Sequence, residues 1–336
     1  MPLLKDAEVN EADINERNPS IAVIGGGTGL STLLRGLKLY FERITAVVTV
    51  SDDGGSSGTI RKSMHMLPPG DIRNCILALA NTEPTMAELL NYRFTEGELK
   101  GHSFGNLFLA ALNGISGSFD EAVARMNEVL AVTGSVIPVT TSDVNIEARF
   151  EDGSSVLGES RILFHKKKHG CRISRVGLIP EKPPALPKAV SAIEKADIIV
   201  FGPGSLYTSV IPNLLVEGIP EAVKRSKAVK IYVLNIMTQE GETEEYTAFD
   251  HVSEIFAHSY KGIFDICLYN TDTIPKRFIN RYKSEDAYPV LLDEERFEGS
   301  GVKLIGTGLS ADAGGFIRHD PKKLAAAIAN IYTGGL

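Results

Sequence analysis

The stretch that decides the fold is IAVIGGGTGL, from Ile21 to Leu30. Its first four residues are all apolar, which is typical of a strand buried on both faces of a parallel sheet. Leucines then recur at helical spacing from Leu30 to Leu37, and a β-branched run follows over 44–50. A strand, a glycine turn, a helix and a second strand within about 30 residues predict a βαβ unit.

The same pattern returns in the second half of the chain. The run DIIVF, at 197–201, leads into a second glycine turn, and a closing helix is predicted over 321–332. Further strands are predicted over 230–235, 265–270 and 302–305. Between the halves, about 71–131 is predicted to be helical, and the alternation over about 136–180 indicates antiparallel hairpins.

These patterns predict an α/β fold: a Rossmann-like parallel sheet flanked by helices, with a helical segment and a small antiparallel β insertion. We expect residues 19–336 to form one nucleotide-binding domain. Residues 1–18 hold five acids and little apolar periodicity, and are predicted to be an acidic flexible tail.

Composition excludes several classes of protein. Of the 336 residues, 43% are hydrophobic, which is enough for a sizeable core. The 35 basic and 42 acidic residues give a net charge of −7, which argues against general nucleic-acid binding. No apolar run is long enough for a membrane span, no secretory signal is visible, and the three cysteines are far apart. We therefore expect a cytoplasmic protein; whether it forms a homo-oligomer stays open.

The first glycine turn is the main candidate for phosphate binding. Gly26, Gly27, Thr28 and Gly29 lie between strand and helix, where free backbone N–H groups favour an anion. The alternative is a turn that only packs strand on helix. No Gly-Lys-Ser/Thr follows, so this is not a Walker A loop, and the dinucleotide fingerprint is incomplete because Leu30 stands at its sixth position. NAD stays as a weaker alternative ligand.

An acidic loop follows the second strand. Asp52, Asp53 and Gly54 open the run DDGGSSG, at the sheet edge where α/β folds bind ligands. Asp52 and Asp53 could hold Mg²⁺ or accept from a sugar hydroxyl. The alternative is that both are turn residues.

The run PPGDIRN, at 68–74, opens a helix. Asp71 is predicted to cap that helix or to contact a metal or substrate, and the two roles are compatible. Arg73 and Asn74 lie in its first turn, within expected reach of a phosphate. Further along, His102 is a candidate for proton transfer, with a packing role as the alternative.

The second glycine turn, GPGSLYTS at 202–209, repeats the arrangement of the first. Gly204, Ser205 and Thr208 are candidates for nucleotide binding, and we expect the two turns to meet at one ligand. The polar loop NIMTQEGET, at 235–243, is predicted to line the same cleft. Tyr282 and Arg318 could supply a stacking face and a cation.

His165 and His169 have the i,i+4 spacing of metal ligands on a helix. The surrounding alternation predicts a hairpin, however, in which that spacing does not converge. We therefore expect no metal at these two histidines.

The motifs GGGTGLSTLLRGL, TVSDDGGSSG, PPGDIRN, HSFGNLFL, GPGSLYTSVIPNLL and NIMTQEGET, in this order, closely resemble the bacterial gluconeogenesis factor family. That family is related to the 2-phospho-L-lactate transferases of cofactor F420 synthesis. The resemblance covers nearly everything from about Ser20 onward.

The resemblance implies a nucleotide cleft on a Rossmann-like fold. It implies that Gly26, Gly27, Thr28 and Gly29 face a diphosphate, Asp52 and Asp53 the metal or transferred group, and Gly204 and Ser205 the nucleotide. The loops DDGGSSG and GPGSLYTS depart from the transferase pattern and match the gluconeogenesis factors. Members of that branch resemble regulatory proteins that bind UDP-sugars and are needed for growth on gluconeogenic carbon sources and for cell shape. A metal-dependent phospho-group transferase is the alternative, and an NAD-binding dehydrogenase is a weaker one.

Overall fold

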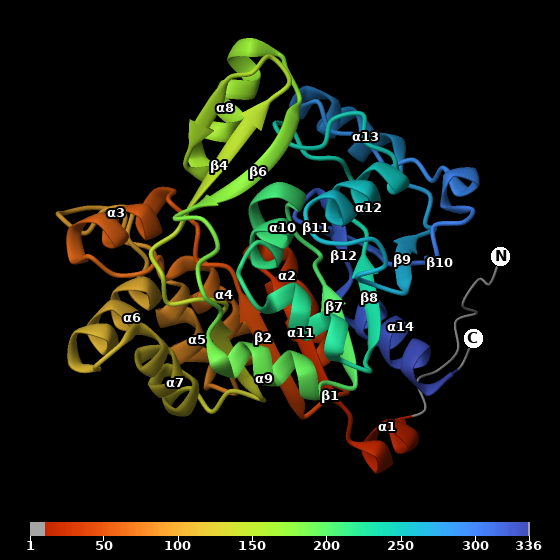
Figure 1. The fold of residues 1–336 in the computed structure, drawn as a ribbon. Helices are drawn as coiled ribbons and strands as arrows, with labels where there is room; N and C mark the ends of the chain where they lie inside the picture. Colours follow the sequence, from red (N-terminus) through yellow and green to blue (C-terminus); the bar gives the residue numbers. More distant parts are fainter. Residues whose placement is uncertain (1–10, 335–336) are drawn as a thin grey trace.

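A seven-stranded parallel sheet forms the centre of the molecule, in a computed structural model that describes residues 11–334 (Figure 1). Its strand order is β10-β9-β8-β7-β1-β2-β3. The strands are β1 (Ser20–Gly25), β2 (Arg43–Val48), β3 (Ser135–Pro138), β7 (Ile198–Phe201), β8 (Val229–Val233), β9 (Ile266–Asn270) and β10 (Lys303–Thr307). This confirms the predicted Rossmann-like α/β fold, and the six strands predicted for the two halves all lie in this sheet.

The strand order reverses between β1 and β7. From β1 the chain moves outward to β2 and β3, returns to β7 on the other side of β1, and continues outward through β8 and β9 to β10. Ile21 of β1 pairs with Ile44 on one side and Ile198 on the other, all in parallel register. The crevice beyond such a reversal is where open α/β sheets bind ligands. Both glycine turns follow the two strands at this point.

Helices cover both faces of the sheet (Figure 1). The helix α2 (Gly27–Leu37) packs against α4 (Gly70–Leu79) and α14 (Pro321–Thr333), and buries Leu30, Leu33 and Leu34 completely. The opposite face carries α9 (Pro187–Lys195), the π-helical turn η1 (Leu206–Val210), α10 (Ile211–Leu214) and α11 (Ile219–Arg225). Burial of leucine and isoleucine on both faces explains why the central strands are continuously apolar.

The remaining elements extend both ends of the sheet. A helical segment lies beside β2 and β3, and its further helices are α3 (Gly55–Met64), α5 (Pro84–Asn91), α6 (Phe104–Ile115) and α7 (Phe119–Val129). The C-terminal half adds α12 (Ala248–Ala257), α13 (Lys276–Tyr282), the turns η2 (Lys283–Glu285) and η3 (Glu294–Phe297), and the hairpin β11 (Ser310–Ala313) and β12 (Phe316–His319).

The predicted N-terminal tail differs from the structure. Residues 1–10 lie outside the described residues, but 11–17 form a helix, α1 (Glu11–Arg17), that contacts α14. Ile14 is only 2% exposed there. A single buried isoleucine in a seven-residue helix is too weak a periodic signal to separate a short docked helix from a tail.

The predicted hairpin insertion also differs. Its antiparallel sheet is formed by β4 (Asn145–Phe150), β5 (Ser155–Leu157) and β6 (Ile173–Ile179), whereas β3 belongs to the main sheet. Between β5 and β6 the chain forms a helix, α8 (Glu159–His169), and the hairpin interpretation is wrong for this segment. The insertion projects beyond the carboxyl ends of the main strands (Figure 1).

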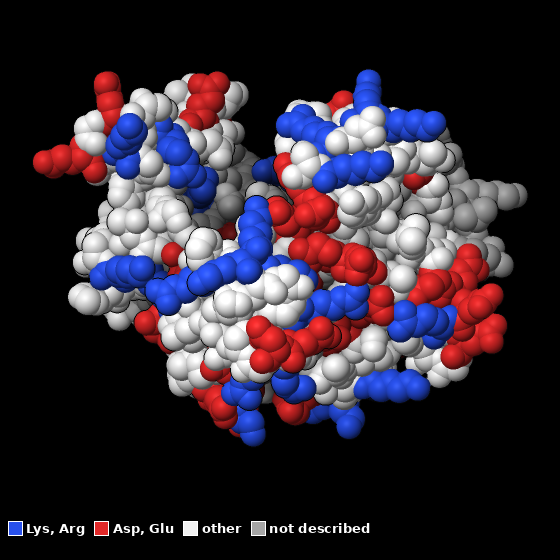
Figure 2. All heavy atoms as spheres, turned by 90° about the horizontal axis from the view of Figure 1, so that it is seen from above, with Lys and Arg blue, Asp and Glu red and all other residues white. Residues whose placement is uncertain are grey.

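No helix within residues 11–334 is long and apolar enough to cross a membrane. Figure 2 shows acidic and basic side chains interspersed over the face seen from above, which is hollowed between two lobes.

Candidate functional site

The two glycine turns pack directly against each other. A Cβ atom on Gly29 would lie 2.6 Å from the carbonyl oxygen of Pro203, and one on Gly204 would lie 3.2 Å from that of Gly26. Side chains at these positions would force the turns apart. Glycine is therefore needed at Gly29 so that α2 can begin against the second turn.

A cavity of about 480 Å³ opens where the turns meet, which is within the usual range for a small-molecule site. It brings together seven of the residues predicted to bind a nucleotide: Gly27, Thr28, Gly29, Gly204, Ser205, Tyr282 and Arg318. The loop after β8 contributes Asn235 to Glu240 to its lining. Gly26 and Thr208, also predicted, do not line it.

Asp71 contacts the first turn and does not cap its own helix. The N-cap of α4 is Pro69, and a carboxylate oxygen of Asp71 accepts the backbone N–H of Gly27 at 2.8 Å. The expectation that all amides of the first turn are free is therefore wrong at Gly27. Glycine at position 26 fits this close packing, because a Cβ there would lie 2.6 Å from Thr49 Cγ2 and 2.8 Å from the same carboxylate.

Three carboxylates from different elements influence one another beside this turn. Burial and the nearby Asp52 raise the pKa of Asp71 to about 6. Burial, with Asp52 and Asp71 next in effect, raises the pKa of Glu159 well above its ordinary range. A divalent cation would relieve this repulsion, and carboxylate oxygens are the ligands that Mg²⁺ prefers. The donor atoms of Asp52, Asp71 and Glu159 do not all lie within 4.8 Å of one another in this structure, so their side chains would have to move to hold one ion together.

The adjacent acids Asp52 and Asp53 have separate partners. Asp52 accepts the backbone N–H of Gly54 at 2.9 Å. Asp53 accepts the backbone N–H of Ser160 at 2.8 Å, and so caps the N-terminus of α8, where Gly158 supplies no side-chain cap. Asp53 therefore ties the acidic loop to the insertion.

Arg73 does not reach the cavity. Its side chain is buried, and its Nε donates to the Asn106 side chain at 3.2 Å. Asn106 donates to Ser56, whose hydroxyl lies 3.2 Å from His102 Nδ1. Asn74 is half-buried on α4 and is also outside the cavity. Three predicted motifs thus meet in one polar chain that supports the acidic loop.

The loop after β8 holds the second turn in place. Asn235 donates to the Gly204 carbonyl at 2.8 Å, and Ser205 donates to Gln239 at 2.7 Å. Glu242 accepts the Tyr207 backbone N–H and the Thr208 hydroxyl, both at 3.0 Å. The Thr208 hydroxyl is therefore already hydrogen-bonded to Glu242. Burial raises the pKa of Glu242 to about 7.

The opposite wall supplies one exposed cation. Arg318 is exposed and lines the cavity, while His319 beside it is buried. Burial lowers the pKa of His319 to about 4, so this ring is neutral near pH 7. The Tyr282 hydroxyl donates to the Ile317 carbonyl at 3.0 Å, which fixes the ring in the cavity wall.

Comparison with known proteins agrees with this architecture. The family model described as "2-phospho-L-lactate transferase CofD" matches residues 21–310. A relative from Thermoanaerobacterium thermosulfurigenes is 53% identical over 313 residues, which are 93% of this chain and 97% of the relative. The gluconeogenesis factor of Bacillus subtilis (strain 168) is 46% identical, over 94% of this chain and 98% of its own.

The chain belongs to the gluconeogenesis factor family, within the CofD group. A crystal structure of protein BH3568 from Bacillus halodurans has a TM-score of 0.89 to this chain at 46% identity. It covers 93% of this chain and 99% of that one.

Two carboxylates near the site are not among the residues expected from the sequence. Glu242 lies in the polar loop NIMTQEGET, where only the density of polar residues signals it. Glu159 lies in the segment predicted to be a hairpin, and that interpretation gives no reason to place it near Asp52.

Proposed function

We propose that this protein is a regulator that binds a nucleoside-diphosphate sugar, such as a UDP-sugar, in the cavity between its glycine turns. The proposal includes the family role suggested by resemblance: support of growth on gluconeogenic carbon sources and of cell shape. The observation that carries it is that both turns, at the reversal point of the sheet, open into one cavity.

The lining suits such a ligand. The N-terminus of α2 offers the positive end of a helix dipole to a diphosphate, and Arg318 offers a cation. Ser205, Asn235 and Gln239 supply hydroxyl and amide groups for a base or sugar. A few convergent polar groups around a preformed cavity are typical of a specific small-molecule site.

A metal-dependent phospho-group transferase is the second candidate. The carboxylates Asp52, Asp71 and Glu159 beside the first turn favour it, as does the match to the CofD model. A bound Mg²⁺ would stabilise negative charge on a transferred phospho-group.

Thermal unfolding with separate ligands tests the two functions. UDP-N-acetylglucosamine, UDP-glucose, GDP and NAD are each added with and without Mg²⁺. A ligand at 100 times its Kd should add about 2.7 kcal/mol to the free energy of unfolding. We expect UDP-sugars to stabilise the protein without Mg²⁺ and to remain intact. Stabilisation only by GDP with Mg²⁺, together with product formation, would reject the regulator.

Two arginine variants test whether the UDP-sugar binds in this cavity. Arg318→Gln removes the cation of the cavity, whereas Arg277→Gln removes an exposed arginine of α13 outside it. We expect the first to weaken UDP-sugar binding about tenfold or more, by loss of a charge-assisted contact. The second should leave the affinity unchanged. Equal affinity in both variants would place the ligand elsewhere.

A further inference from the structure

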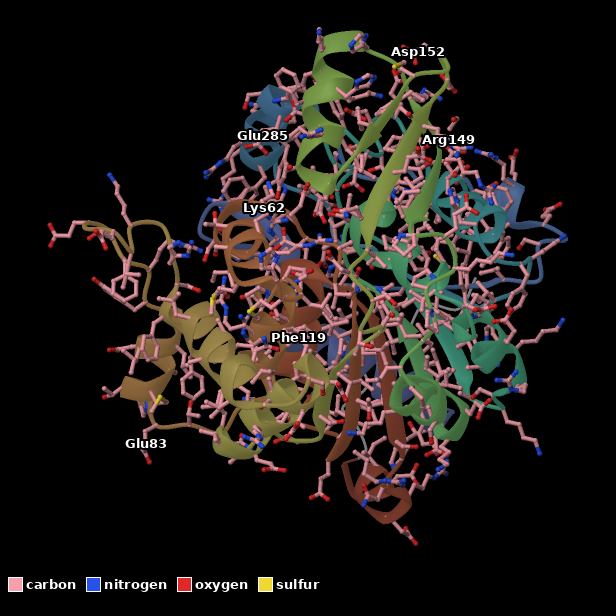
Figure 3. The ribbon with its side chains drawn as sticks, turned by 60° about the vertical axis from the view of Figure 1, so that its left-hand side comes forward. Lys62, Glu83, Phe119, Arg149, Asp152 and Glu285 are labelled. Atoms are coloured by element: carbon pink, nitrogen blue, oxygen red, sulfur yellow. The ribbon has the colours of Figure 1, made fainter. Side chains whose placement is uncertain are left out.

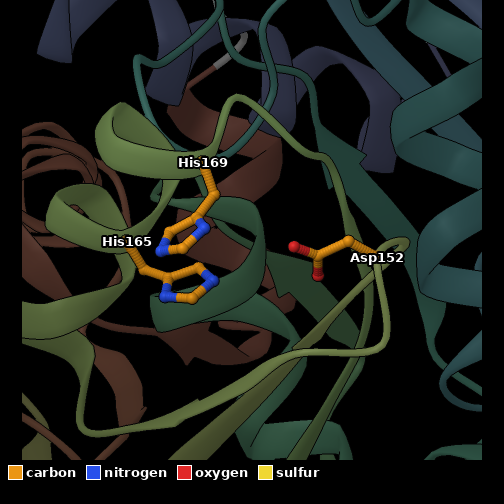
Figure 4. A group of neighbouring side chains, drawn as sticks. All are labelled: Asp152, His165 and His169. Atoms are coloured by element: carbon orange, nitrogen blue, oxygen red, sulfur yellow. The ribbon is translucent and has the colours of Figure 1, made fainter.

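The end of the insertion carries a cluster of metal-ligating side chains that the proposed function does not use. Asp152, His165 and His169 each offer a donor atom, and these atoms all lie within 4.8 Å of one another (Figure 4). Figure 3 shows Asp152 at the outer end of the small sheet. The cluster is the one group of three or more such residues found among residues 11–334.

The helix α8 creates this cluster. His165 and His169 are one turn apart on a helix, so their rings stack with centroids 4.3 Å apart. The turn between β4 and β5 then brings Asp152 alongside. This corrects the expectation, drawn from a hairpin, that the two histidines do not converge.

A candidate fourth donor is nearby. Cys171 follows Gly170, the C-cap of α8, and burial and the neighbouring Asp152 raise the pKa of its thiol. Its sulfur is not among the donor atoms that already lie within 4.8 Å of one another, so it has to approach by a side-chain rotation. Cys171 is a free, half-buried thiol. Two imidazoles, a carboxylate and a thiol are a ligand set that Zn²⁺ accepts in tetrahedral coordination.

The present hydrogen bonds can give way to a metal. The Ser154 hydroxyl donates to Asp152 at 2.5 Å and lies 2.8 Å from His165 Nε2, and so bridges the two. Rotation of this one hydroxyl frees His165 Nε2 and removes one of the two hydrogen bonds to Asp152 Oδ1, which still accepts the Ser154 backbone N–H at 2.9 Å. Side-chain rotations can then close the donor atoms around a metal, because Asp152 and His169 are exposed.

The local charge also permits a cation. Lys166 and Lys167, which lie between the histidines in the sequence, pair with Glu244 at 3.5 Å and Glu240 at 3.0 Å. The C-terminal end of a helix carries a partial negative charge, which favours a cation at this end of α8.

We propose that Asp152, His165, His169 and Cys171 form a zinc site. Binding releases the Cys171 proton to solvent. The metal links the β4–β5 turn to the C-terminal end of α8, the helix whose first turn presents Glu159 and is capped by Asp53. It therefore stabilises the insertion at the end opposite the acidic loop.

Titration of the reduced, chelator-treated full-length protein with Co²⁺ tests the site. We expect one Co²⁺ per chain, the intense visible bands of tetrahedral coordination, and a near-ultraviolet thiolate-to-cobalt band. One equivalent of Zn²⁺ should remove all of them. Absence of binding at micromolar metal would overturn the proposal, and absence of the thiolate band would overturn the role of Cys171.

Variants assign the ligands. His169→Gln, at an exposed position, and His165→Gln should each weaken binding by at least about tenfold. Cys171→Ser should remove only the thiolate band and part of the affinity. Lys168→Gln, between the histidines on the same helix, is the matched control and should bind as the wild type does.

The Asp52→Asn variant distinguishes metal binding at this site from metal binding at the carboxylates Asp52, Asp71 and Glu159. We expect it to leave the tetrahedral spectrum unchanged. A cobalt signal that is lost in Asp52→Asn and kept in His169→Gln would place the metal at the acidic loop and overturn the proposal. Far-ultraviolet circular dichroism of each variant checks that it is folded.

Discussion

At the scale of residues, Asp71 occupies a position that is unfavourable for an ionised carboxylate. Burial and Asp52 raise its pKa from 3.8 to about 6, so the folded protein binds more protons than the unfolded chain between these values. The contribution of Asp71 to stability therefore falls as the pH rises through this window, and the loss remains above it. An acid retained under such conditions is typical of a functional site.

We predict that Asp71→Asn stabilises the protein at pH 7.5, because the amide oxygen can still accept the Gly27 N–H without carrying a charge. The gain should be at most about 3 kcal/mol, from 1.36 kcal/mol per unit of pKa difference, and should vanish near pH 4. Urea unfolding at pH 4, 5.5 and 7.5 measures it. A variant that is less stable than the wild type at pH 7.5 would contradict this account.

At the scale of elements, the close approach of the two glycine turns explains the need for glycine in α2. We predict that Gly29→Ala destabilises the protein by about 1–3 kcal/mol, because its methyl group meets the Pro203 carbonyl. Gly114→Ala is the matched control: it lies in α6, and a Cβ there meets nothing within 4 Å. This control should gain up to about 1 kcal/mol from helix propensity. Equal effects in denaturant unfolding would show that the turns are not in close contact.

At the scale of the whole molecule, the core protects two of the three cysteines. Cys75 and Cys267 are 0% exposed, and burial raises the pKa of both thiols. We predict that an aromatic disulfide reagent modifies only Cys171 in the native protein at pH 8, and all three after unfolding in urea. Cys171→Ser, which should show no fast reaction, identifies the thiol. Rapid modification of a second thiol would mean that the core opens without global unfolding.

Much of the main sheet was predictable, because its strands are buried on both faces and therefore read as short apolar runs. The insertion was not, because α8 buries only Ile162, while Leu163 and Phe164 are exposed. A helix with one buried residue has no amphipathic period. Its contacts are distant in sequence: the Asp53 cap and the lysine pairs with Glu240 and Glu244.

The features of the candidate site also fall into those that the sequence predicts and those that only the folded structure determines. The glycine motifs, the acidic loop and the apolar strands could be recognised locally, since close backbone approach and sheet burial restrict residue types at each position. Long-range packing alone determined that Asp71 faces Gly27, that Arg73 turns toward α6, and that Glu159 lies near Asp52. These side chains come from elements that meet only when the sheet and the insertion are assembled. Their neighbours, and hence their charge states, are therefore properties of the folded chain.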